Sequence, residues 1–158
     1  MANILITGGT GYLGIPLVKR LHTLGHNLKL LIRETSNITP FEDLETIEYI
    51  IGDVRDIESL YKAAENVDII YHLAAYTRKW AKDKALWENT NVKGTENIAN
   101  VALEKNKKLI YISSFAALGP NNDGTGNPVD ETFEHQGIFC LEYERSKHFG
   151  LKKIRNNN

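Results

Sequence analysis

The chain has 158 residues, of which 42% are apolar and 25% are charged, and its formal net charge is −1. This length suits one domain with a substantial core, and the balanced charge favours neither nucleic acid nor a membrane surface as a partner. The single cysteine, Cys140, excludes an internal disulfide and a cysteine-rich metal site, so we expect an ordinary buried or half-buried thiol. No signal peptide precedes the first strand-like run, and no apolar run approaches the roughly 20 residues of a membrane span, so we expect a cytoplasmic protein.

Short apolar runs alternate with helix-like stretches along the chain. The patterns predict strands at 4–6, 28–33, 47–51, 68–73 and 109–113. They predict helices at 12–24, at 57–66 behind the capping residue Asp56, at 84–105 and at 143–154. Continuously apolar strands separated by helices indicate a parallel sheet that is covered on both faces. We therefore expect a single α/β domain with a doubly wound parallel sheet, the Rossmann fold.

Several finer expectations follow from the same patterns. In the first helix, one face carries Leu13, Leu17, Leu21 and Leu24, and Gly25 ends the helix. The long helix turns Val92, Thr95, Ile98, Ala99 and Ala102 inward. Residues 121–134 are rich in Asn, Asp, Gly and Pro and are predicted to form a loop. Trp80 and Trp87 are interpreted as packing residues, and the five histidines show no metal-ligand spacing.

The stretch TGGTGYLG, Thr7 to Gly14, directly follows the first predicted strand. In a strand–turn–helix unit of this kind, Gly8 can make the tight turn, Gly11 can let a pyrophosphate approach the backbone, and Gly14 can let the helix pack closely. The alternative is a tight turn without a ligand. A strand before the motif and a helix after it favour a dinucleotide-binding turn, because the helix N-terminus attracts phosphate.

Arg33 stands at the end of the second predicted strand, where an acidic residue would hold the adenosine ribose hydroxyls. A guanidinium can instead pair with a 2′-phosphate. This position therefore predicts NADP rather than NAD, with a solvated surface arginine beside Glu34 as the alternative.

Tyr143 and Lys147 are four residues apart and share one face of the last predicted helix. A neighbouring ammonium lowers the pKa of a phenol, so such a tyrosine could exchange a proton with an alcohol or a carbonyl. Taken alone, this spacing more often belongs to an exposed helical pair.

Together these motifs resemble the extended short-chain dehydrogenase/reductase family, from Asn3 to about Gly150. The matching segments are TGGTGYLG at 7–14, GDVRD at 52–56, HLAA at 72–75, NVKGT at 91–95, Ser113–Ser114 with Gly119, and YERSK at 143–147. The segments HLAAYTRKWAKD and YERSK are most similar to the dihydroflavonol-reductase-like branch, which includes related bacterial sugar-epimerase-like members.

The resemblance implies roles for individual residues. Catalysis would rest on Ser114, Tyr143 and Lys147. Asp53 and Val54 would contact adenine, Ala74 and Ala75 would line the cofactor bed, and Lys147 would also hold the nicotinamide ribose. The full set of implied cofactor contacts is Gly8, Thr10, Gly11, Tyr12, Leu13, Gly14, Arg33, Asp53, Val54, Ala74, Ala75, Asn91, Ser113, Tyr143 and Lys147, with no metal ligand.

Members of this family continue beyond the Tyr–Lys helix into a sixth strand and a substrate-binding region. We therefore expect residues 1–158 to be a C-terminally incomplete NAD(P)-binding domain. Its longer form would be an NADP-dependent oxidoreductase acting on a small carbonyl or sugar substrate, or a nucleotide-sugar epimerase/dehydratase, with a homodimer as a possible state. The alternatives are a non-catalytic nucleotide-binding or partner-binding module and an inactive truncated product.

Overall fold

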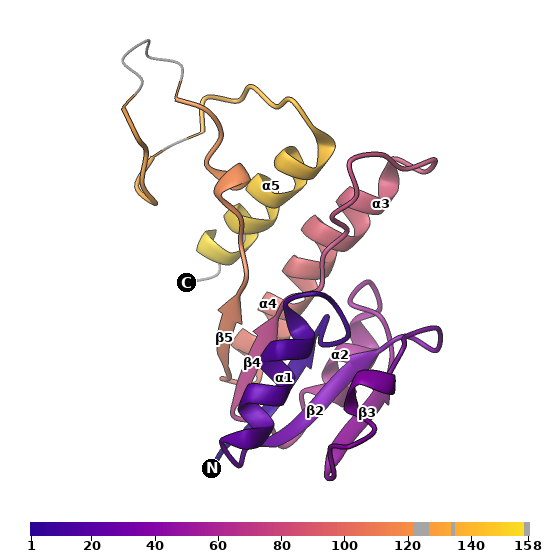
Figure 1. Ribbon diagram of the computed structural model, residues 1–158. Helices are drawn as coiled ribbons and strands as arrows, with labels where there is room; N and C mark the ends of the chain where they lie inside the picture. The colour runs from indigo at the N-terminus through magenta and orange to yellow at the C-terminus, as the bar shows by residue number, and fades with distance from the viewer. Residues whose placement is uncertain (122–126, 134, 157–158) are drawn as a thin grey trace.

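The computed structural model describes residues 1–121, 127–133 and 135–156 and contains one parallel five-stranded sheet (Figure 1). The strands are β1 (Asn3–Thr7), β2 (Asn27–Ile32), β3 (Ile47–Ile51), β4 (Ile69–His72) and β5 (Lys108–Tyr111). Their spatial order is β3-β2-β1-β4-β5, and each neighbouring pair is parallel. The predicted doubly wound α/β fold is confirmed.

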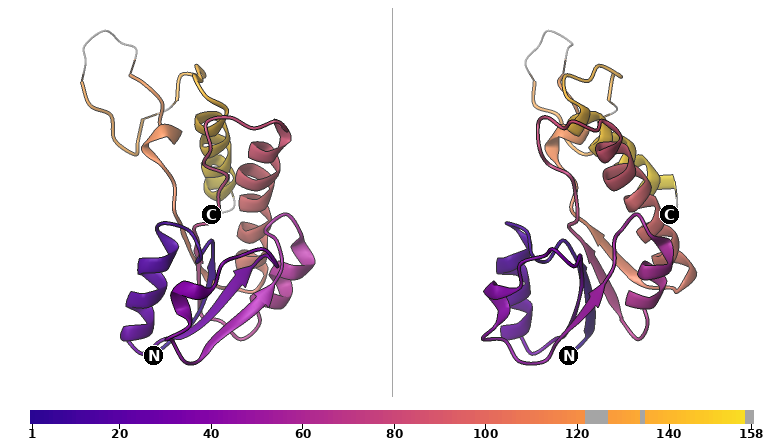
Figure 2. Two further views of the ribbon diagram at one scale, coloured as in Figure 1. Left: turned by 45° about the vertical axis from the view of Figure 1, so that its right-hand side comes forward. Right: turned by 90° about the vertical axis from the view of Figure 1, so that its right-hand side faces the viewer.

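Helices cover both faces of this sheet (Figure 2). One apolar cluster joins α1 (Gly14–Thr23) and the 3₁₀ turn η1 (Thr39–Phe41) to side chains such as Ile4 and Ile6 of β1. The other cluster joins α2 (Ile57–Ala63) and α4 (Gly94–Glu104) to Leu5 on the opposite side of the same strand. Alternate residues of β1 therefore enter separate cores, as the two-residue period of a strand requires.

The first helix is shorter than predicted. It begins at Gly14 and buries Val18 and Leu21, whereas Leu13 and Leu24 lie outside it and are 58% and 52% exposed. The expected leucine face is thus correct only in its middle. Gly25 ends the helix as predicted: its φ is +76°, and its N–H donates to the carbonyl of His22.

The long helix predicted at 84–105 runs as three consecutive segments. These are α3 (Ala85–Trp87), the π-helical segment η2 (Glu88–Lys93) and α4. All five residues predicted to face inward are buried: Val92, Thr95, Ile98, Ala99 and Ala102. Trp87 is buried as expected, but Trp80 is 74% exposed, so its assignment as a packing residue is wrong.

The last helix, α5 (Glu142–Asn156), packs against η2, α4 and the 3₁₀ turn η3 (Phe115–Ala117), beyond the carboxyl end of β5 (Figure 1). Of the predicted loop, residues 122–126 and 134 lie outside the described residues, and the rest contains no helix or strand. Cys140 is exposed, which corrects the expected burial, because it precedes α5 in an irregular segment. Among the described helices, none has the length and apolar character that crossing a bilayer requires.

Candidate functional site

The carboxyl ends of the parallel strands meet at one edge of the sheet, which collects most of the residues singled out in the sequence. The chain reverses its direction of winding between β1 and β4, and open α/β sheets bind ligands outside the strand ends at such a point. The glycine turn follows β1, Ala74 and Ala75 follow β4, and Ser113 and Ser114 follow β5.

The glycine turn has the geometry of a phosphate cradle. At Gly8 the φ is +73°, and a Cβ there would lie 2.6 Å from the backbone nitrogen of Ala74. A Cβ at Gly14 would lie 2.3 Å from the carbonyl oxygen of Gly8, so α1 packs against the turn itself. A Cβ at Gly11 would meet only that same oxygen, at 3.2 Å, because its Cα faces away from the fold. The turn is therefore closed at its base and open above Gly11.

The start of α1 suits an anion. Its N-cap position, Leu13, makes no side-chain capping bond, and the first turn carries no acidic residue. Tyr12 is 94% exposed, and Thr10 is half-buried beside it. Uncapped N–H groups at a helix N-terminus are a ready binding site for phosphate.

Arg33 and Asp53 mark the other end of this edge, beyond β2 and β3. Arg33 is exposed, and its backbone N–H donates to Ser36 Oγ at 3.0 Å. The Asp53 carboxylate is held by Arg55, whose Nε and one terminal nitrogen donate to its two oxygens at 2.8 Å each. Hydrogen bonding to Arg55, with a smaller contribution from the charge of Arg33, lowers the pKa of Asp53 below its ordinary value.

The contacts of Val54 and Asp56 restrict which groups near Asp53 could contact a ligand. Asp56 caps α2 by accepting the N–H of Glu58, so Asp53 is not the capping residue of this helix. The Val54 side chain is 6% exposed and belongs to the core, and its carbonyl accepts Asn97 Nδ2 at 3.0 Å. A contact of Val54 with adenine would therefore come from its N–H.

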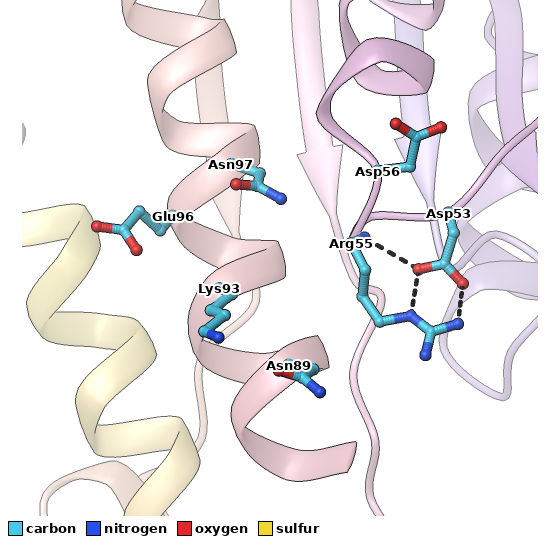
Figure 3. A pocket seen from close by; sticks show the side chains of 7 residues that line it. All are labelled: Asp53, Arg55, Asp56, Asn89, Lys93, Glu96 and Asn97. Carbon is cyan, nitrogen blue, oxygen red and sulfur yellow. Dashed lines mark hydrogen bonds and ion pairs between the residues drawn. The ribbon is translucent and has the colours of Figure 1, made fainter. Parts of the chain in front are cut away.

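An open groove of about 610 Å³ lies between the start of α2 and the η2–α4 helix (Figure 3). Figure 3 shows the Asp53–Arg55 pair on one wall and the polar side chains of η2 and α4 on the other. The lining residues are Asp53, Arg55, Asp56, Asn89, Lys93, Glu96 and Asn97. The edge of the sheet beyond β2 and β3 is therefore polar and accessible.

His72, at the end of β4, ties three elements together beneath the glycine turn. It is fully buried, with Nδ1 2.7 Å from Thr7 Oγ1 and Nε2 3.3 Å from Thr95 Oγ1. Burial, aided by the charge of Lys147, lowers the pKa of His72 to about 3, so the ring is neutral. Thr7 Oγ1 also accepts the N–H of Ala74 at 3.4 Å. The sequence placed His72 in its strand but did not reveal this network.

Asn91 links the β4 loop to the last helix. Its amide accepts the N–H of Tyr76 at 2.7 Å and donates to the carbonyl of Tyr76 at 3.0 Å and to Ser146 Oγ at 2.9 Å. Ser146 Oγ in turn donates to the carbonyl of Tyr143 at 2.8 Å. Asn91 is 1% exposed and lies in the π-helical segment, so its amide is buried and not on the solvent side of the helix. Sequence reasoning missed these contacts of Asn91 with the Tyr76 backbone and the Ser146 hydroxyl.

The serines after β5 have different surroundings. Ser114 Oγ accepts the N–H of Ala116 at 3.2 Å and caps η3, which is the structural role that a serine after a strand often takes. Ser113 Oγ is buried and has no hydrogen-bond partner among the residues that the structure describes. A buried hydroxyl without a partner is a group that a ligand could satisfy.

Tyr143 and Lys147 lie one turn apart on α5, as predicted. Tyr143 is half-buried, whereas Lys147 is 3% exposed. Lys147 Nζ donates to the carbonyl of Ile112 at 2.8 Å, next to Ser113, and burial lowers the pKa of Lys147 to about 8. The structure thus brings Lys147 to the end of β5, while no described hydrogen bond joins Tyr143 to Ser114.

Comparison with known proteins supports the family resemblance seen in the sequence motifs. The family model for the 3-beta hydroxysteroid dehydrogenase/isomerase family matches residues 5–158. A putative dihydroflavonol 4-reductase of Synechocystis sp. is 32% identical over 130 residues, which cover 82% of this chain and 37% of that protein. An N-acetyl-alpha-D-glucosaminyl-diphospho-ditrans,octacis-undecaprenol 4-epimerase of Escherichia coli O157:H7 is 34% identical over 139 residues, which cover 85% of this chain and 39% of that protein.

A solved structure has the same fold. The Bordetella bronchiseptica enzyme WbmH in complex with NAD+ superposes with a TM-score of 0.86 at 19% identity, over 100% of this chain and 53% of that one. This chain spans well under half of the length of the two relatives above. The family match over nearly the whole chain confirms the resemblance seen in the motifs. The chain belongs to the 3-beta hydroxysteroid dehydrogenase/isomerase family, among the extended short-chain dehydrogenases/reductases.

Proposed function

We propose that this chain is the cofactor-binding part of an NADP-dependent oxidoreductase. The observation that carries the proposal is the cradle after β1. Gly8 and Gly14 are closed against backbone, Gly11 is open, and the start of α1 lacks a side-chain cap. The pyrophosphate of a dinucleotide fits this arrangement because it needs backbone N–H groups and close approach. WbmH, whose structure contains NAD+, supports the class of ligand.

The residues around the cradle would hold the remainder of the cofactor. Thr10, Tyr12 and Leu13 would border the pyrophosphate, and Ala74 and Ala75 would floor the bed after β4. Asp53 and the Val54 N–H would meet adenine, and Arg33 would meet a 2′-phosphate. Ser113, Asn91, Tyr143 and Lys147 would surround the nicotinamide end.

When bound, a nicotinamide cofactor supplies or accepts a hydride. In the proposed reaction, Tyr143 passes a proton to the substrate oxygen or removes one from it, and Ser114 holds that oxygen by a hydrogen bond. Lys147 holds the ribose hydroxyls and stabilises the Tyr143 phenolate. The hydroxyl of Ser114 can still donate, because the Ala116 N–H uses only an acceptor position on its oxygen.

A second candidate is epimerisation or dehydration of a sugar nucleotide by the same residues. The Escherichia coli 4-epimerase favours it, since its identity and coverage are slightly higher than those of the dihydroflavonol reductase relative. Both candidates share the cofactor and the proton-transfer residues and differ in the substrate. The substrate-binding part of either enzyme would lie outside the matched region.

The cofactor assignment is tested by titrating NADPH and NADH into the chain and into Arg33→Ala. Loss of a charged hydrogen bond should weaken NADPH binding by about 1.5–3 kcal/mol and leave NADH binding unchanged. Arg20→Ala is the matched control, because it removes the same charge from the last turn of α1, away from the cradle. Equal NADPH affinity in Arg33→Ala and the unmodified chain would contradict the preference for NADP.

The chemical assignment is tested in a chimera that joins this chain to the C-terminal part of a relative. Tyr143→Phe should reduce turnover about 10²–10⁴-fold, the usual contribution of general acid–base catalysis. NADPH binding should stay nearly intact, because the ring remains in place. A Tyr143→Phe chimera that turns over as fast as its parent would exclude Tyr143 as the proton donor.

A further inference from the structure

Lys147 is a buried cation that has only neutral partners. Lys147 is only 3% exposed, and none of the ion pairs within the described ranges involves it. Its ammonium donates one hydrogen bond, to the carbonyl of Ile112, and lies 4.5 Å from the centroid of the Tyr111 ring. Burial alone disfavours the charged form, so these two contacts are what keeps the ammonium in place.

Tyr111 packs against the His72 ring at the end of the sheet. It is the last residue of β5 and lies opposite His72 of β4 in the parallel register. The two rings stack with their centroids 5.8 Å apart and their planes 20° apart. His72 is itself fixed by the hydroxyls of Thr7 and Thr95. The ring of Tyr111 therefore takes its orientation from the network beneath the glycine turn.

The last helix closes over the same ring. A Cβ at Gly150 would lie 3.1 Å from Tyr111 Oη and 2.4 Å from the carbonyl oxygen of Asn91. Only glycine lets α5 approach this closely at that position. Because Gly150 lies one turn beyond Lys147, the approach brings the Lys147 side chain over the Tyr111 ring.

From this arrangement we propose that Tyr111 is a positioning residue: its ring face holds the Lys147 ammonium at the end of β5, beside Ser113. The negative face of an aromatic ring attracts a cation, and the attraction grows when both groups are removed from water. The ring thus supplies what a carboxylate would supply elsewhere, without adding a charge that would repel a phosphate or a hydride.

The consequence for catalysis rests on the proposed function, in which Lys147 contacts the cofactor ribose and Tyr143. The positioning role itself concerns the chain without cofactor. Three titratable groups lie near Lys147: Tyr143, one turn away on α5, and the two buried groups His72 of β4 and Tyr111 of β5. His72 is neutral down to a pH of about 3, and burial raises the pKa of Tyr111 to about 12. Neither changes its charge where Lys147 titrates.

The test is an NMR titration of the Lys147 side chain in the cofactor-free protein, with ¹³C-labelled lysine and Lys147→Arg for assignment. In the unmodified chain the pKa of Lys147 should be about 8. Tyr111→Phe keeps the ring face and should leave this pKa within about 0.3, since the Tyr111 hydroxyl faces Gly150 and not the ammonium. Tyr111→Leu keeps an apolar side chain but removes the ring, so the pKa should fall by about 1.

A series of fluorinated phenylalanines at position 111 provides the decisive comparison, because fluorine weakens the negative ring face with little change in shape. The pKa of Lys147 should fall stepwise with each added fluorine. The series also decides the question if circular dichroism shows that Tyr111→Leu does not fold. A pKa that stays constant along the series would overturn the proposal, because a ring that only fills space would give that result.

The experiments distinguish failure of the cofactor assignment from failure of the positioning role of Tyr111. If the chain binds neither NADPH nor NADH while the stepwise fall is observed, the positioning role of Tyr111 stands and the cofactor assignment does not. If cofactor binds and the pKa of Lys147 is constant along the series, the reverse holds.

Discussion

The two ends of the candidate cofactor site differ in how they hold their functional groups. At the adenosine end, Arg33 is exposed, and Asp53 is bound by Arg55 in an ion pair that faces an open groove. At the nicotinamide end, His72, Asn91 and Lys147 are at most 3% exposed and are held by neutral partners. Exposed ion pairs contribute little to stability, whereas buried polar groups that lose a partner cost much. The difference predicts an adjustable end and a rigid end.

The largest effect should come from His72, at the rigid end, as the pH falls. Its pKa in the folded chain is about 3, below the ordinary value of 6.5, so acid protonates the unfolded chain first. The stability that the neutral His72 contributes is therefore fully present above pH 6.5 and is lost as the pH falls toward 3. Between pH 6.5 and a pH of about 4 the loss should be about 3 kcal/mol.

Urea unfolding at a series of pH values measures this loss in the unmodified chain and in His72→Gln. Gln keeps hydrogen-bonding groups for Thr7 and Thr95 but does not titrate. The contribution of the carboxylates is common to both proteins and cancels in the difference. Parallel stability curves would show that His72 is not kept neutral by the fold.

The strands and the glycine turn were predictable because each depends on a local pattern. An apolar run followed by closely spaced glycines specifies a strand and a tight turn whatever the rest of the chain does, and Asp56 caps α2 through its own neighbour. The leucine pattern predicted a helix that is too long at both ends. Leu13 and Leu24 lie outside α1, which begins after the glycine turn and ends before Gly25.

The rigid end could not be foreseen in the same way. His72 meets Thr7 and Thr95 only because β4 lies beside β1 and under α4, and this strand order is not written in any local segment. The π-helical segment likewise contains Asn91, whose bonds to Tyr76 and Ser146 join residues far apart in the sequence. The sequence motifs predicted which residues belong to the candidate site, but the contacts that hold those residues in place were visible only in the structure.

The second prediction compares two asparagines of the same π-helical segment. Asn91→Ala removes three hydrogen bonds at the rigid end: the backbone N–H and carbonyl of the half-buried Tyr76 lose these partners, and Ser146 Oγ keeps only its bond to the carbonyl of Tyr143. It should lower the free energy of unfolding by about 2–3 kcal/mol. Asn89→Ala, which lines the groove at the adjustable end, should change it by less than about 0.5 kcal/mol.

Urea denaturation at one pH measures both variants. Similar losses for Asn91→Ala and Asn89→Ala would mean that the buried amide network does not stabilise the link between the β4 loop and α5. The contrast between the two ends would then be one of exposure only.

The smallest effect on stability should come from Arg55, and it sharpens the contrast through ligand affinity. Arg55→Ala removes a partly exposed ion pair with Asp53, which is worth about 0.2–1 kcal/mol. The same change removes the side-chain donors of Arg55 from both Asp53 oxygens, although Oδ1 still accepts the backbone N–H of residue 55, and it leaves Oδ2 free for the adenine amine of the proposed complex. Release of a competitor of that strength can raise NADPH affinity by at most about 5-fold.

Fluorescence titration of NADPH into Arg55→Ala should show this small gain, with Arg20→Ala unchanged as the charge-matched control. A tenfold or greater loss, in contrast, would mean that Arg55 itself contacts the cofactor, and the adenosine end would then be a preformed site like the nicotinamide end.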